Sequence, residues 1–260
     1  EVAKLQKLKW LNLDQNKISD EGLQHLYNLK NLTSLHLPYG STRTLDLVRL
    51  KEELPTCSIR EGLESLKRVP RRPPYWSQPP QPKKKELTDD EKRRLAWWRK
   101  KQAERRGRPE ADLVSPADEE AIFIADPIVE KEVRKKLKKP EGQLTKTDLE
   151  QVVTLLLDET KITDKSLKEV AKLQNLTELR LTSTGITDVG LKDVAKFQKL
   201  KWLYLGNTKI TDAGLKEAAK LQNLRILRLN STQITDAGLK EVAKLQNLIS
   251  LDLSATQITD

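Results

Sequence analysis

The stretch that decides the fold is residues 176–260, in which one 24-residue unit is repeated. Three full copies read LTELRLTSTGITDVGLKDVAKFQK, LKWLYLGNTKITDAGLKEAAKLQN and LRILRLNSTQITDAGLKEVAKLQN, and a partial fourth reads LISLDLSATQITD. An isoleucine followed two residues later by an aspartate keeps this period without a slip, and the isoleucines are Ile162, Ile186, Ile210, Ile234 and Ile258. A fixed period in this range predicts a solenoid, in which each unit buries its apolar face against its neighbours.

Composition agrees with an open, thin array, since 37% of the 260 residues are hydrophobic and 33% are charged. No apolar run reaches the roughly 18 residues that span a membrane, and no signal-peptide pattern opens the chain. The chain begins within a repeat and without a methionine, so the sequence predicts no compartment. A single cysteine, Cys57, excludes an internal disulfide framework.

The net charge of +10 is confined to one region. Residues 60–108 carry 17 Lys and Arg against 7 Asp and Glu, whereas the rest of the chain carries 31 of each sign. The repeats are therefore electrically balanced, and the segment between them holds the positive excess.

Residues 1–37 repeat the same unit, because their leucines at 8, 11 and 13 occupy the positions of leucines 248, 251 and 253. Residues 45–60 leave the pattern. Leu47, Leu50 and Leu54 have helical spacing before Pro55, and the next residues alternate as in a short strand. This segment is typical of a cap that closes the last repeat of a solenoid.

Residues 61–125 are predicted to form a proline-rich, basic connector. Six prolines between Pro70 and Pro82 exclude helix interior and favour an extended conformation. Residues 89–106 then have the capping and charge pattern of a helix. A second helix is predicted from Pro127, with Asp126 as its N-cap and an apolar stripe along one side, and it has the character of an opening cap.

The closing cap thus precedes the opening cap in the chain. We predict repeats with a closing cap at 1–60, the connector at 61–125, and an opening cap with repeats at 126–260. One solenoid running through 126–260 and then 1–60 would explain the order as a rotated sequence. The alternatives are that Asp260 stacks on Glu1 of another molecule, or that the chain is an excerpt of a longer array.

Within a unit, Leu200-x-x-Leu203-x-Leu205-x-x-Thr208-x-Ile210 resembles the leucine-rich-repeat consensus, with threonine where asparagine is usual; Asn16 keeps the asparagine. The T-x-I-T-D-x-G-L-K-E-V-A-K-L-Q-N unit is similar to that of bacterial leucine-rich-repeat proteins. The resemblance implies an α/β fold, a right-handed solenoid with parallel strands on the concave face and short helices on the convex face. It also implies a protein-interaction scaffold without catalysis, and it specifies no ligand.

Two roles follow for polar residues of the repeat. The threonine at the asparagine position is expected to satisfy backbone groups in the turn, with a shorter reach than asparagine. The recurring aspartate is expected to be the N-cap of the convex helix. A calcium ladder is not favoured for these aspartates, because none has a second carboxylate at ligand spacing.

The predicted protein-binding site lies on the concave face. Side chains that the strands direct there include residue types enriched at interface hot spots. They are Arg180, Trp202, Tyr204, Ile226 and Arg228, joined by Trp10 and His36 if the rotated order holds. The alternative is that these aromatics pack against the connector or are tolerated surface variation.

A second candidate is the predicted helix at 89–106, where cations cluster around two tryptophans. This pattern suits phosphate neutralisation with base stacking, or adsorption to an anionic membrane surface. Its residues are Arg93, Arg94, Trp97, Trp98, Arg99, Lys100 and Lys101. A basic helix that docks on an acidic neighbour or stays solvated is the more common case.

The sequence predicts no catalysis, cofactor or metal. The two histidines, His25 and His36, fall on different sides of adjacent repeats, without cysteines or carboxylates at metal-ligand spacing. Cys57 is expected to pack as a small apolar residue. A third functional alternative is a structural protein that self-assembles through repeat edges at Glu1 and Asp260.

Overall fold

The computed structural model describes residues 1–39, 44–61 and 121–259, and all of these belong to one compact unit. The helix predicted at 89–106, with most of the connector, lies outside the described residues, as does Asp260. Among the described segments, no helix is both long enough and apolar enough to cross a bilayer.

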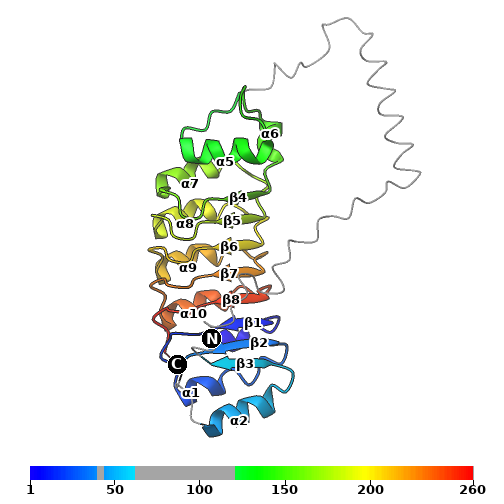
Figure 1. Ribbon diagram of the computed structural model, residues 1–260, viewed down its shortest axis with the longest axis vertical. Coiled ribbons are helices and arrows are strands. Elements are labelled where there is room, and N and C mark those ends of the chain that lie inside the picture. The colour runs from blue at the N-terminus through cyan, green and yellow to red at the C-terminus, as the bar shows by residue number, and fades with distance from the viewer. Residues whose placement is uncertain (40–43, 62–120, 260) are drawn as a thin grey trace, which may run out of the picture. The chain divides into compact units, whose positions relative to one another are not determined.

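Eight short strands form one parallel sheet in the order β3-β2-β1-β8-β7-β6-β5-β4 (Figure 1). The strands are β1 (Trp10–Asn12), β2 (Ser34–Leu37), β3 (Ser58–Glu61), β4 (Thr154–Leu156), β5 (Glu178–Arg180), β6 (Trp202–Tyr204), β7 (Ile226–Arg228) and β8 (Ser250–Asp252). Strand β1 pairs with β8 in parallel, with Leu11 opposite Leu251. The first repeats of the chain therefore continue the array that ends with the last ones.

Short helices line the convex face of the sheet. Each repeat is therefore one strand and one helix around a leucine core (Figure 1). The convex helices are α1 (Asp20–Gln24), α7 (Asp164–Val170), α8 (Asp188–Val194), α9 (Asp212–Ala218) and α10 (Asp236–Val242). One repeat begins at Leu200. Its strand-side residues Leu203, Leu205 and Ile210 are completely buried, and Leu215 of α9 covers them from the helix side. The predicted α/β solenoid is confirmed.

The aspartate of each repeat is not the N-cap, and that prediction is wrong by one residue. The caps of α8, α9 and α10 are the threonines one position earlier; in α9, Thr211 Oγ1 accepts from Ala213 N at 3.2 Å. Asp212 is the first helical residue and turns toward the following coil. Its carboxylate accepts from Thr235 N at 2.9 Å and Thr235 Oγ1 at 2.6 Å. The aspartates thus tie each coil to the next.

The turn after each strand is held by the threonine that replaces asparagine. Thr208 Oγ1 donates to Leu205 O at 2.6 Å, a contact within its own coil. Asn16 reaches farther: Nδ2 donates to Leu13 O at 3.0 Å and to Leu253 O at 2.8 Å, and Oδ1 accepts from Thr256 N at 3.1 Å. The predicted shorter reach of threonine is confirmed, and the asparagine lies where β1 meets β8.

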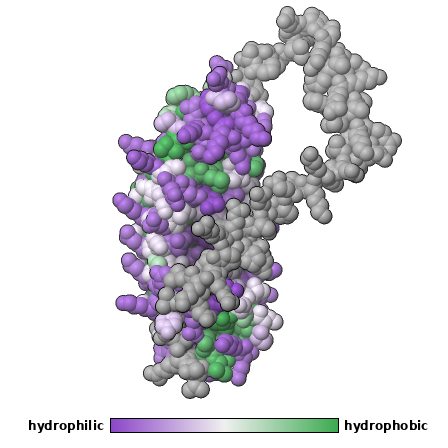
Figure 2. All heavy atoms as spheres, viewed as in Figure 1, coloured by the Kyte–Doolittle hydropathy of each residue, from purple (hydrophilic) through white to green (hydrophobic). Residues whose placement is uncertain are grey.

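The opening end of the array is covered by α5 (Pro127–Leu137) and α6 (Lys146–Glu150). Asp126 Oδ1 caps α5 by accepting from Ile128 N at 2.9 Å, as predicted. Figure 2 shows a hydrophilic surface over this end, with hydrophobic residues beside it. Among the exposed large apolar side chains, Phe123, Val153 and Leu156 belong to this part of the chain.

The closing end is covered by α2 (Thr44–Glu53) and strand β3, so the helix and strand expected there are both present. Leu50 and Leu54 of this segment are buried in the core. Cys57 packs against the same core, and burial raises the pKa of its thiol to about 11. A thiol with this pKa stays protonated and unreactive at neutral pH.

Candidate concave interaction site

The strands present two rows of side chains on the concave face. The register places Glu178, Trp202, Ile226, Ser250 and Trp10 in one row along β5, β6, β7, β8 and β1. The parallel row holds Arg180, Tyr204, Arg228, Asp252 and Asn12 on the same strands. Since strands lie about 4.8 Å apart, neighbours within a row are close enough to touch.

The second row is a chain of cations, aromatics and carboxylates that pair with one another. Arg180 Nε lies 2.7 Å from Asp158 Oδ2, and its guanidinium carbon lies 5.0 Å from the centre of the Tyr204 ring. The guanidinium carbon of Arg228 lies 4.1 Å from the centre of the Trp10 ring, and its Nη1 is 3.8 Å from Asp252 Oδ2. These distances are those of cation–π contacts and ion pairs.

Burial divides the predicted site residues into two groups. Tyr204 and Arg228 are only 9% and 5% exposed, and burial lowers the pKa of the Arg228 guanidinium. Trp202, Ile226 and Trp10 are half-buried. Glu178, Arg180 and Asp252 are half-buried as well, so the exposed part of the face mixes apolar and charged side chains. Both arginines of the second row are already paired with carboxylates.

His36 and Glu178 are the titratable groups at the two sides of this surface. The His36 ring centre lies 5.5 Å from that of Trp10, and burial, followed by the charge of Arg60, lowers the pKa of the imidazole. Burial raises the pKa of the Glu178 carboxyl beside Trp202. His36 is consequently neutral at pH 7 and adds ring surface to Trp10 without charge.

All seven predicted residues are on the one sheet, and the structure brings Arg180 to Tyr204, Arg228 to Trp10 and Trp10 to His36. Sequence reasoning missed Asp158, which holds Arg180 in place. The signal was present, because Asp158 follows Leu156 by two residues and is therefore expected on the same face of the sheet, one position beyond the row that holds Arg180.

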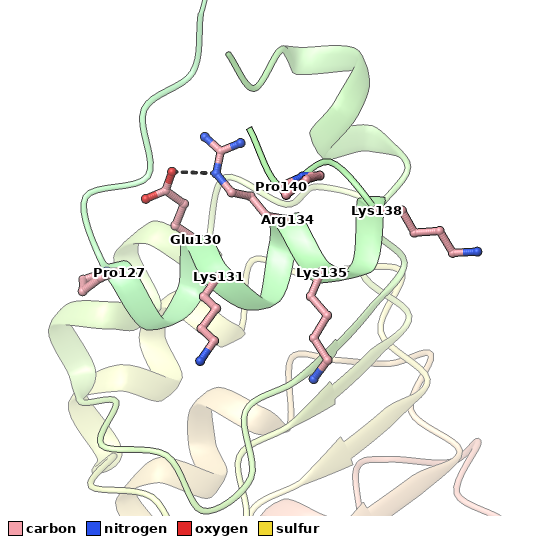
Figure 3. A pocket seen from close by; sticks show the side chains of 7 residues that line it. All are labelled: Pro127, Glu130, Lys131, Arg134, Lys135, Lys138 and Pro140. Atoms are coloured by element: carbon pink, nitrogen blue, oxygen red, sulfur yellow. Dashed lines mark hydrogen bonds and ion pairs between the residues drawn. The ribbon is translucent and has the colours of Figure 1, made fainter. Parts of the chain in front are cut away.

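A separate basic surface lies on the cap helix α5. A hollow of about 510 Å³ there is lined by Pro127, Glu130, Lys131, Arg134, Lys135, Lys138 and Pro140 (Figure 3). Arg134 Nε pairs with Glu130 Oε1 at 2.8 Å, and the three lysines extend outward separately rather than converging (Figure 3). This arrangement is that of a solvated helix face and defines no ligand.

The other predicted functions depend largely on residues outside the described part of the chain. The basic helix with Trp97 and Trp98 lies outside the described residues, so nucleic-acid or anionic-surface binding stays a prediction. The strands next to the predicted open edges, β1 and β8, pair with each other within the chain. In the described ranges, no three His, Cys, Asp or Glu side chains are grouped to hold a metal.

Models of leucine-rich repeats match the chain in three places. A two-copy model matches residues 198–241, and a single-repeat model matches residues 4–26 and 172–195. No curated protein is significantly similar to the chain.

Two solved structures from Listeria monocytogenes strain 4b F2365 are similar to this chain. Internalin InlF has 30% sequence identity and a TM-score of 0.45 over 56% of this chain and 41% of that one. Internalin C2 has 28% identity and a TM-score of 0.42 over 53% of this chain and 68% of that one. The chain thus spans about two fifths of the length of the first and about two thirds of the second.

Proposed function

We propose that this leucine-rich-repeat protein binds a protein partner on the concave face of the array. Proteins of this class are typically interaction scaffolds without enzymatic activity. The centre of the contact is the apolar anchor, which we define as Trp202 and Ile226. Trp10 and His36 extend it along the sheet. The residues of the second row lie beside these side chains on the same face, and Arg228 contacts Trp10.

The observation that carries the proposal is the placement of Trp202 directly opposite Ile226 on adjacent parallel strands, both half-buried. Large aromatic side chains in the middle of a patch account for most of the energy in many protein interfaces. Complete burial of such a side chain contributes about 1.5–3 kcal/mol, and burying the part that is still exposed contributes a fraction of that. Two neighbouring anchors therefore suit a partner that packs an apolar side chain across both of them.

The paired second row makes this surface ready to bind. Arg180 is held by Asp158 and Arg228 by Trp10 and Asp252, so binding does not have to order these side chains. Avoiding that ordering saves about 0.5–1.5 kcal/mol for each long side chain. The concave face therefore offers two apolar anchors beside arginines that are already held in place.

The test compares capture of partners by the full chain and by the double variant Trp202→Ala, Ile226→Ala. Proteins retained from cells of the source are quantified by mass spectrometry, and the thermal unfolding midpoint is measured for each bait. We expect the variant to lose the partner while its midpoint stays close to that of the wild type. Tyr204 is left unchanged because it is buried and its truncation would destabilise the fold.

The matched control is Val189→Ala, which removes an apolar side chain that is 62% exposed on the convex helix α8. It should leave capture unchanged. If the anchor variant retains the same proteins in the same amounts as the control, binding through the concave face is ruled out.

A further inference from the structure

One flank of the sheet carries a row of cations directly before the concave strands. Lys201 precedes β6 and Arg225 precedes β7, and Lys9 holds the equivalent position before β1. Their backbones form a ladder in which Arg225 N donates to Lys201 O, and Lys9 N to Ile249 O, both at 2.8 Å. The side chains therefore leave the flank at the fixed spacing of the strands, about 4.8 Å for each repeat.

The flank is hollowed between these side chains. The hollow has a volume of about 350 Å³ and is lined by Lys7, Lys201, Asn223, Arg225, Asn247 and Ile249. The two asparagines are fixed, since Asn223 Nδ2 donates to Gln198 O at 2.8 Å and Asn247 Nδ2 donates to Gln222 O at 2.9 Å. Three cationic side chains thus surround this hollow. Among the described residues that line it, none carries a carboxylate.

These cations differ from three of the lysines on the helix side. There, Lys196, Lys220 and Lys244 each pair with an acidic residue three positions earlier, at 2.6–2.7 Å. Within the described part of the chain, Lys201 and Arg225 form neither an ion pair nor a side-chain hydrogen bond. Lys7 Nζ donates to the neutral Asn247 Oδ1 at 2.7 Å, and no acidic residue that the structure describes pairs with it.

We propose that this basic flank, made of Lys7, Lys201 and Arg225, binds an acidic segment of the partner whose apolar side chain occupies the anchor. The proposal rests on the proposed function and specifies the chemistry of the partner. Lys201 and Arg225 are adjacent in sequence to Trp202 and Ile226, so one segment can reach both surfaces. Charged contacts around an apolar centre chiefly set specificity and the association rate.

The test uses two fluorescein-labelled peptides that differ only in charge. Each has one central tryptophan for the anchor, flanked by glutamates in one peptide and by glutamines in the other. Fluorescence anisotropy gives their affinities for the full chain at low and at physiological ionic strength. We expect the glutamate peptide to bind about tenfold more tightly than the glutamine peptide, with the difference shrinking as salt is added.

Two double variants locate the charge effect. Lys201→Glu with Arg225→Glu should remove the preference for the glutamate peptide. Lys192→Glu with Lys216→Glu makes the same change in net charge on exposed convex residues and should keep it. Equal binding of the two peptides to the wild-type chain, whether weak or absent, overturns the proposal. So does an equal loss of preference in the two variants, because it would report net charge alone.

The anchor variant separates this inference from the proposed function. Trp202→Ala with Ile226→Ala should weaken both peptides equally if the concave face is the binding surface. If it weakens neither while the flank variant still abolishes the preference, the basic flank stands and the anchor fails. If it weakens both while the flank variant has no effect, the anchor stands and the flank fails.

Discussion

At the scale of the residue, each convex helix begins with an aspartate. The carboxylate of this aspartate limits the size of the side chain that can pack against it in the next repeat. The carboxylate of Asp188 accepts from Thr211 N at 2.8 Å and from Thr211 Oγ1 at 2.6 Å. It also fills the space beside Gly214, where a Cβ would lie 2.3 Å from Asp188 Oδ1. The glycine is therefore required by a close approach between coils.

This packing predicts a non-additive pair of substitutions. Gly214→Ala should destabilise the chain by about 2 kcal/mol because the methyl group overlaps the carboxylate, although alanine is the better helix former. Asp188→Ala should cost about 2 kcal/mol through the loss of charge-assisted hydrogen bonds. In the double variant the methyl group has room, so the combined loss should be about 1 kcal/mol less than the sum.

Urea unfolding of the four proteins measures this cycle. Gly185→Ala is the control, since its nearest new neighbour is Ile162 O at 3.2 Å, and it should cost less than Gly214→Ala. Strict additivity of the two substitutions would contradict the account. The sequence correctly predicted that the aspartate lies at the start of the helix, but the predicted N-cap role was wrong. The hydrogen-bond partner of the aspartate is a threonine in the next coil, which local capping rules do not consider.

At the scale of the element, Asn16 determines how well β1 joins β8. Replacing Asn16 by Thr would give this turn the residue that the other repeats use, but the hydroxyl would reach only its own coil, as Thr208 does. The contacts to Leu253 O and Thr256 N would be lost. We expect a loss of about 1–2 kcal/mol in the free energy of unfolding, measured in urea, because Thr256 N loses its acceptor, whereas Leu253 O keeps Thr256 Oγ1 as a donor at 2.7 Å.

The control at this scale is Thr208→Ser, which keeps a hydroxyl that can bond within the same coil. It should lower the free energy of unfolding by less than about 1 kcal/mol. An Asn16→Thr variant as stable as the control would show that the junction does not depend on the asparagine.

Most elements followed from local patterns, and the exceptions have physical reasons. Apolar spacing and capping residues predicted the helix from Pro127 and the helix and strand around Pro55. The short helix α6 was missed, although Thr145 and Asp148 form a capping box at its start. On the candidate site, alternation along the strands predicted which side chains share a face. It could not predict that Trp10, from the other end of the chain, covers Arg228.

At the scale of the whole molecule, the array is continuous in space although the chain is not continuous along it. The two groups of repeats meet where β1 pairs with β8, and Leu11 and Leu251 are completely buried on the two sides of that junction. The site spans this junction, because Trp10 on one side contacts Arg228 on the other. The candidate site is therefore complete only when the two groups of repeats are joined.

The last prediction tests the junction by dividing the chain. Residues 1–61 and 121–259, produced as separate chains, should associate one to one, since the strand pairing, the leucine core and the Asn16 contacts of the junction remain available. Size-exclusion chromatography with light scattering gives the mass of the complex, and circular dichroism reports structure gained on mixing. Asn16→Ala in the first fragment should weaken association by about tenfold or more. Two fragments that elute separately at concentrations where each stays soluble would show that the junction does not hold without the connector.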